Sequence, residues 1–297
     1  MEEMSCVMNN DEIIMNLVES AITLFYRKIA NVDHHRFKSW EYCYQNFIEA
    51  RSRTLNSLDI DALSLHLAFY LASWGMYRGS SFLLQRGYKI HTPVVEELLK
   101  DKYDDFANIN WNETSDVDTK LDLLDSLTEA INGYYAEVRK SVSPDVKNKD
   151  DISNVLLTKI LMGTLGCAPA YDRFFIQGIK SLDVSTGNFN RNSLKNLIYF
   201  YRENSDKLEK IRNSLHEDKS NLIYPQMKII DMGFWQIGYV INSWEIEYKK
   251  NNKDSELPPL TFDDIKKLLK KESSEMDKQQ LDDAKRKVMK EKIVQVP

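Results

Sequence analysis

Apolar residues recur every three or four positions along most of the chain, the spacing that places them on one face of an α-helix. In residues 11–29 this face holds Ile13, Leu17, Ile22 and Phe25. Acidic residues begin the segment and basic residues end it, which complements the dipole of a helix. The pattern therefore predicts a helix near the start of the chain.

The same spacing predicts helices throughout, with boundaries set by capping residues and prolines. The predicted segments are 39–53, 59–85, 92–103, 121–138, 152–165, 170–179, 193–216, which holds two helices, and 225–250. Ser39 and Asp59 are predicted N-caps, and Pro93 and Pro225 are predicted to open helices. The sequence thus predicts an all-α fold, an irregular bundle of about nine or ten helices.

Residues 59–85 are apolar on nearly every side, which predicts the central helix of the body. Polar side chains follow one line of this segment at steps of three or four residues: His66, Tyr70, Ser73, Tyr77 and Ser81. A buried polar stripe needs hydrogen-bond partners. Arg78 lies one step from the line, and a buried guanidinium needs an anion or a carboxylate.

Residues 166–173 interrupt the helical pattern at Gly166 to Pro169. A helix that starts after Pro169 presents free backbone N–H groups, and such groups bind anions. The favoured interpretation is a buried ion pair that joins the two halves of the chain, between Arg78 and either Asp172 or another carboxylate. The alternative is a ligand pocket at the same place.

In that alternative, an enzyme or receptor binds an anionic, phosphate-bearing small molecule between the central helix and the 166–173 break. The candidate ligand-binding residues are Arg78, Ser81, Tyr171 and Arg173. The candidate catalytic residues, available for proton transfer, are His66, Tyr77 and Asp172. The sequence does not indicate which reaction such a site would catalyse.

The chain divides by composition into a helical body, residues 1–250, and a linker with a charged tail, residues 251–297. Residues 141–150 have the composition of an exposed linker and are the best candidate for an internal boundary. In the tail, Thr261 and Asp264 are typical of a capping box. The narrow apolar stripe of residues 261–293 predicts docking on a protein partner, self-association or packing on the chain's own body.

Composition narrows the class of protein further. The net charge of −5 disfavours nucleic-acid binding, and residues 60–76 fall short of the roughly 20 apolar residues that span a bilayer. The 3 cysteines and 5 histidines are scattered, so we expect neither a disulfide framework nor a metal site. No phosphate-binding glycine loop, HExxH, CxxC or GxSxG motif is present, and no cofactor is indicated. A cytoplasmic protein is expected, and the many Lys, Asn and Ile residues favour a bacterial source.

Arg212 and His216 resemble the Arg-to-His pair of the helical HEPN ribonucleases, whose paired helices place both side chains on one face. Three residues separate them here, whereas the family usually has four to six. A histidine in the last turn of a helix is also favoured by the helix dipole. A ribonuclease is therefore the weakest of the functional hypotheses.

The absence of catalytic motifs and the separable tail favour a non-catalytic cytoplasmic protein that acts through protein–protein interaction. The anion-binding enzyme or receptor is the second hypothesis.

Overall fold

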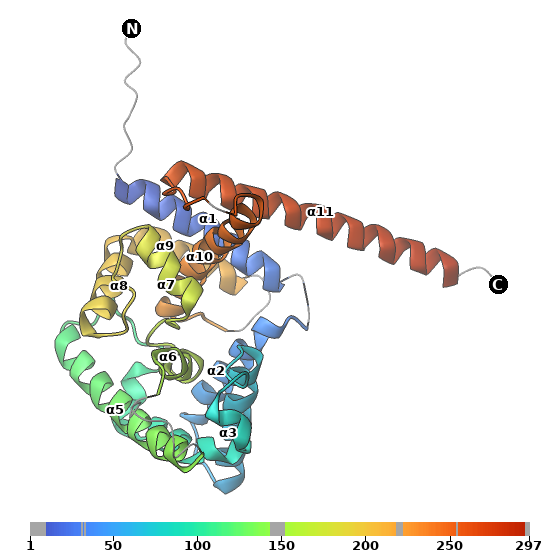
Figure 1. Ribbon diagram of the computed structural model, residues 1–297. Helices are drawn as coiled ribbons and strands as arrows, with labels where there is room; N and C mark the ends of the chain where they lie inside the picture. The colour runs from blue at the N-terminus through green and yellow to red at the C-terminus, as the bar shows by residue number, and fades with distance from the viewer. Residues whose placement is uncertain are drawn as a thin grey trace.

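The computed structural model describes residues 10–30, 32, 34–142, 152–217, 222–253 and 255–294, with side chains up to residue 282 in the last helix. Within these ranges the chain forms α-helices, short 3-10 helices and no strand, so the predicted all-α fold is confirmed (Figure 1). The α-helices are α1 (Asn10–Ala30), α2 (Ser39–Ala50), α3 (Ser57–Ser73), α4 (Thr92–Leu98), α5 (Val117–Val142), α6 (Asn154–Thr164), α7 (Arg173–Ser181), α8 (Arg191–Glu203), α9 (Ser205–Glu217), α10 (Gln226–Asn251) and α11 (Phe262–Val294). The 3-10 helices are η1 (Arg36–Lys38), η2 (Phe82–Gln85), η3 (Tyr88–His91) and η4 (Asp101–Phe106).

Capping side chains fix several helix starts. Asn56 accepts from the N–H groups of Leu58 and Asp59, and Asp59 accepts from the N–H of Asn56, so the cap of α3 is Asn56 rather than Asp59. Thr261 and Asp264 form the expected reciprocal pair at α11. Ser39 does not cap α2 but forms its first residue, because η1 precedes it.

Residues 59–85 do not form the single central helix that the sequence predicts. α3 ends at Ser73 because Gly75, at φ +77°, donates to the carbonyl of Ala72 while Met76 donates to that of Leu71. This is a Schellman motif, in which a left-handed glycine closes a helix. One face of α3 also meets solvent, since Phe69 is 63% exposed. The predicted polar stripe is therefore broken after Ser73.

α10 is instead the central helix. Nearly every residue from Gln226 to Ile241 is buried, and α10 packs against α1, α7, α8, α9 and α11. The α7–α10 crossing is close because it is made at glycines: a Cβ on Gly238 would lie 1.8 Å from the carbonyl oxygen of Phe174. This crossing fixes the start of α7 against α10.

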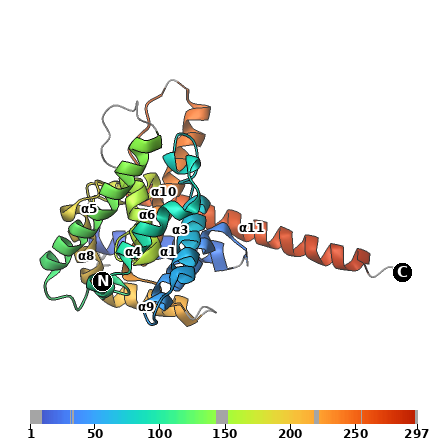
Figure 2. The same ribbon diagram turned by 90° about the horizontal axis from the view of Figure 1, so that it is seen from below.

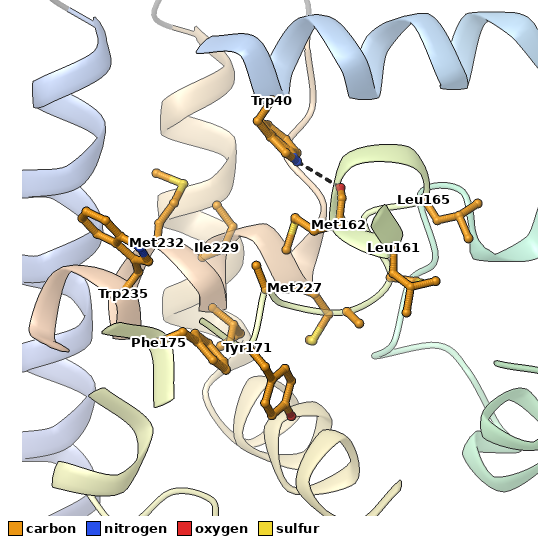
Figure 3. Packing of buried hydrophobic residues seen from close by; sticks show 14 of the residues in the cluster. Trp40, Leu161, Met162, Leu165, Tyr171, Phe175, Met227, Ile229, Met232 and Trp235 are labelled. Carbon is orange, nitrogen blue, oxygen red and sulfur yellow. Dashed lines mark hydrogen bonds between the residues drawn. The ribbon is translucent and has the colours of Figure 1, made fainter. Parts of the chain in front are cut away.

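The core beside α10 joins side chains from several helices (Figure 3). Met227, Ile229 and Met232 of α10 lie between Trp40 of α2 and Phe175 of α7 in this view. The Trp40 indole N–H donates to the carbonyl oxygen of Met162 at 2.9 Å, which ties α2 to α6. The buried indole thus has a polar partner as well as apolar packing.

α11 packs on α1 and α10 and then extends away from the body (Figures 1 and 2). Ile265 and Leu269 are buried at its docked end. Lys28 of α1 forms a 2.6 Å ion pair with Glu272 of α11. No helix in the described part of the chain is long and apolar enough to cross a membrane. Most of the predicted boundary at 141–150 lies outside the described residues.

Candidate functional site

Six segments that are distant in sequence meet around a cleft of about 640 Å³, which we call the cationic cleft. They are the end of α1, the segment around η1, the turn after α3, α6, the start of α7 and the middle of α10. Its volume falls in the range of about 300–1,000 Å³ that is typical of small-molecule sites. A ligand in this cleft would contact both halves of the chain.

Cations predominate on the wall of the cationic cleft. Its described lining residues include five with positive charge, Lys28, Arg36, Arg78, Lys159 and Arg173, and one carboxylate, Asp172. A carboxylate outside the lining, Glu272, pairs with Lys28. Among the described residues, Arg36, Arg78 and Arg173 make no ion pair. The cleft therefore carries a local excess of positive charge although the chain as a whole is acidic.

Aromatic rings form the other part of the wall. They are Phe37, Trp74, Phe174, Trp235 and Tyr239. Phe37 and Trp74 stack with centroids 4.4 Å apart, and Trp235 and Tyr239 stack at 5.3 Å. The guanidinium of Arg173 lies 4.4 Å from the ring centroid of Phe174. Stacked rings of this kind hold their positions with little loss of side-chain entropy when a ligand binds.

The turn after α3 places Arg78 on the cleft. Gly75 lies directly beneath the arginine side chain, because a Cβ on this glycine would be 3.2 Å from both Cζ and Nε of Arg78. Gly79, at φ +59°, completes the turn. Gly75 thus both ends α3 and lies against the guanidinium of Arg78.

Asp172 connects α6, α7 and α10. Its Oδ1 accepts from the N–H groups of Phe174 and Phe175 and so caps α7. Its Oδ2 accepts from the Trp235 indole at 3.2 Å and lies 3.6 Å from Nζ of Lys159. One carboxylate therefore serves four partners, which holds it in a single orientation.

Lys159 is buried, with 4% of its surface exposed. Its Nζ donates to the carbonyl oxygen of Trp74 at 3.0 Å and lies 5.3 Å from the centre of the Trp74 ring. Burial lowers the pKa of Lys159; Asp172 and Asp231 oppose this shift, and Arg78 adds to it. The amine therefore loses its proton more readily than that of an exposed lysine.

A second buried ion pair lies on α10, next to the segment that joins α6 and α7. Lys228 and Asp231 of α10 pair at 2.7 Å, and both are 3% exposed or less at the side chain. Asp231 also accepts from the N–H of Ala170, which fixes the chain between α6 and α7. Lys228 lies 5.0 Å from the centre of the Trp40 ring. Burial raises the pKa of Asp231, and the charge of Lys228 opposes this shift.

Three of the predicted site residues come together here. Arg78, Asp172 and Arg173 all line the cationic cleft, although they belong to different halves of the chain. The predicted buried ion pair between Arg78 and Asp172 is wrong, because Arg78 is exposed and the ion pair of Asp172 is made with Lys159. Lys159 of α6, rather than Arg78 of the turn after α3, is the cation that lies within ion-pair distance of the Asp172 carboxylate.

The other four predicted site residues do not line this cleft. Tyr77 bonds Nε2 of the buried His91 at 2.6 Å, and Ser81 caps η2. Tyr171 is buried and bonds the Ser193 hydroxyl at 2.9 Å. These three side chains make structural hydrogen bonds outside the cleft.

His66 lies half-buried on α3, outside the cleft. Burial lowers its pKa. The predicted role of His66 in proton transfer is therefore not supported by its position.

The predicted anion site at free N–H groups after Pro169 is also wrong. α7 begins at Arg173, and Asp172 already accepts from its first N–H groups. The N–H groups of Ala170 and Tyr171 donate to Asp231 and Thr158. The positive side chains, rather than the backbone, are left to bind an anion.

Arg212, the arginine of the HEPN-like pair, contacts a residue of its own helix, α9, and the segment before α10. Its guanidinium pairs with Glu209 at 2.7 Å and donates to the carbonyl oxygen of Tyr224. The side chain of His216 lies outside the described residues. Arg212 therefore has a structural role that explains its position.

Lys159 and the pair Lys228 and Asp231 were not among the predicted site residues. Each is a charged residue within an otherwise apolar helical segment, in VLLTKILMG and QMKIIDMGF. A charge in such a place must be paired or functional, and this signal was available in the sequence. The aromatic residues of the cleft could not be identified from the sequence, because many other aromatic residues occur along the chain.

A larger and more open hollow of about 760 Å³ lies beside α9. Acidic and basic side chains are mixed on its wall, among them Asp206, Glu209 and Lys210, and it has no aromatic lining residue among those described. The cationic cleft is the stronger candidate because positive side chains outnumber its one carboxylate and because aromatic rings line it.

Comparison of the chain with models of protein families, with curated proteins and with solved structures gives no match. The function is therefore argued from the geometry of the cationic cleft.

Proposed function

We propose that the protein binds an anionic small molecule in the cationic cleft, as a receptor or an enzyme. The observation that carries this proposal is the pair of guanidinium groups, Arg78 and Arg173, on the same cleft without a carboxylate partner among the described residues. Guanidinium groups form bidentate, charge-assisted hydrogen bonds with phosphate and carboxylate. A ligand that supplies such a group would neutralise them both.

The aromatic wall narrows the ligand class. Phe37 and Trp74 stack at 4.4 Å, and their rings lie beside the cations. A ligand that joins an anionic group to a flat or apolar portion fits both parts of the wall. Phosphorylated aromatic or sugar-like compounds and aromatic carboxylates belong to this class.

Tryptophan fluorescence tests the proposal directly, because Trp74 and Trp235 line the cleft. Sodium diphosphate is titrated against the full-length protein at constant ionic strength. We expect a saturable change in emission that Arg78→Gln weakens and that Arg53→Gln, on an exposed arginine outside the cleft, leaves unchanged. An identical titration for all three proteins would refute the proposal.

A second candidate function concerns α11. Beyond its contacts with α1 and α10 this helix extends away from the body, and Leu281 is 57% exposed (Figure 2). An isolated helical segment is marginally stable in water unless something packs against it. We therefore also propose that residues 261–293 dock on a protein partner or on a second copy of the chain. A pull-down with the full-length protein and with a chain that ends at residue 260 tests this, and retention of every partner by the shortened chain would refute it.

A further inference from the structure

Lys159 is the residue of the cationic cleft whose presence packing alone does not explain. Most of α6 is apolar, and Leu156, Ile160 and Leu161 near Lys159 are all buried in the core. A lysine at this place loses its hydration and the freedom of a long side chain. An apolar residue would fill the same space without either cost.

Few groups around Lys159 offset the cost of burying its charged amine. Its partners are one carbonyl oxygen, at 3.0 Å, and one oxygen of Asp172, at 3.6 Å. The carboxylate is shared with the Trp235 indole and with the capped end of α7. Arg78 adds a like charge nearby. Burial and this like charge favour the neutral amine, which is the nucleophilic form.

Two features of the cleft bear on how a carbonyl compound could meet this amine. Lys159 itself lines the cleft, with 4% of its surface exposed. Arg78 and Arg173 lie on the same cleft and would hold an anionic group of a bound molecule. A compound that has a carbonyl group at one end and an anionic group at the other matches these two kinds of lining residue.

We propose that Lys159 forms an imine with an anionic aldehyde or ketone, an inference that rests on the anion-binding function proposed above. The nitrogen lone pair attacks the carbonyl carbon, and the C=O bond gives way to a C=N bond. Both hydrogens of the neutral amine leave with the carbonyl oxygen as one molecule of water. Asp172 accepts a proton from the nitrogen and returns it to the departing hydroxyl. No oxidant or reductant takes part.

The substrate class follows from this step. It comprises carbonyl compounds that carry a phosphate or a carboxylate, such as sugar phosphates in their open form and 2-oxo acids. An imine withdraws electrons from the neighbouring carbon, so the reactions open to such a site are bond cleavage, bond formation or proton exchange next to the carbonyl group.

Reductive trapping tests the proposal in the full-length protein. Pyridoxal 5′-phosphate, a phosphate-bearing aldehyde, serves as the probe, and sodium borohydride reduces any imine to a stable amine. Peptide mass spectrometry then compares the modified fraction of Lys159 with that of Lys249, an exposed lysine on α10. We expect Lys159 to be modified at least roughly tenfold more, the equivalent of one charge-assisted hydrogen bond to the phosphate.

Three controls separate the anion site from ordinary lysine reactivity. Sodium diphosphate should suppress the modification of Lys159 and leave that of Lys249 unchanged. Pyridoxal, which lacks the phosphate, should show a smaller preference for Lys159 than pyridoxal 5′-phosphate does. Arg78→Gln should lower the modification of Lys159 and leave that of Lys249 unchanged. A thermal melting curve of this variant is recorded to check that it is folded.

The result that overturns the imine proposal is equal modification of Lys159 and Lys249 in a protein that still binds diphosphate by calorimetry. The anion-binding function would then stand without the imine. A protein that binds no diphosphate and shows no preference for Lys159 would overturn both proposals.

Discussion

Nζ of Lys159 lies 3.6 Å from Oδ2 of Asp172, and this contact joins α6 to the first turn of α7 inside the cationic cleft. Both side chains are largely buried, at 5% and 15% exposed. The same carboxylate also caps α7 and accepts from Trp235. The contact therefore holds α6 and the start of α7 together, and it is also where the proposed imine chemistry moves a proton.

Replacing Asp172 by Asn should destabilise the protein by about 3 kcal/mol, because the change leaves a buried lysine without its counter-ion. Asn retains an oxygen that can cap α7, so loss of the cap does not contribute. Urea unfolding measures the effect. The double variant with Lys159→Met should lose less than the sum of the two single variants. Simple additivity would show that the two groups do not interact.

Gly75→Ala should destabilise the protein by about 1–2 kcal/mol, the cost of a left-handed backbone for a residue with a Cβ. It should also weaken diphosphate binding, since the new methyl group meets the guanidinium of Arg78. Gly79→Ala is the matched control: its φ is also positive, but a Cβ there meets nothing within 4 Å. Equal loss of affinity in the two variants would mean that the position of Arg78 is not what matters.

Stability should fall as the pH falls from about 6.5 to about 4, because of His91. Burial lowers the pKa of His91 from 6.5 to about 4, while Tyr77 and Tyr135 bond its two ring nitrogens. Between these values the unfolded chain binds a proton that the folded chain does not, so unfolding is favoured. The loss should reach about 3 kcal/mol at pH 4 and grow no further below it from this residue.

Chemical denaturation at a series of pH values measures how the free energy of unfolding changes with pH. Carboxylates contribute in the same range, so the informative quantity is the difference from His91→Gln, which does not titrate. If the two proteins lose stability in parallel between pH 6.5 and 4, His91 is not responsible.

Ile265→Ala should destabilise the protein by about 3 kcal/mol, because Ile265 is fully buried where α11 meets the body. Leu281→Ala should change the unfolding free energy by less than about 0.5 kcal/mol, the range of surface changes, because Leu281 is 57% exposed. Thermal melts of the two proteins distinguish the docked part of α11 from the part around Leu281. A large loss from Leu281→Ala would mean that this part also packs on the body.

Much of the fold could be predicted because most helices here are bounded by local signals. α1 and α10 begin and end close to the expected residues, and α4 begins at the expected Thr92 but ends at Leu98 rather than near residue 103. The extent of α3 was missed because the pattern remains apolar past Gly75. A glycine that closes a helix and one that permits close packing look alike in a sequence.

The site could be predicted only in part. Arg78, Asp172 and Arg173 stood out as polar residues at a helix break or in an apolar segment, and they do share a cleft. The sequence could not show that Lys159 is the ion-pair partner of Asp172, because the distance between the two side chains depends on how α6 lies relative to the start of α7. The same holds for the aromatic wall, whose rings come from η1, the turn after α3, α7 and α10.

Isothermal calorimetry with sodium diphosphate tests the anion-binding cleft most directly, using the full-length protein, Arg78→Gln, Arg173→Gln and the control Arg53→Gln. The account predicts binding to the unaltered protein and to the control, and a loss of roughly tenfold in affinity for each cleft variant, the equivalent of one charge-assisted hydrogen bond. Binding of equal strength to all four proteins, or no binding to any of them, would contradict it.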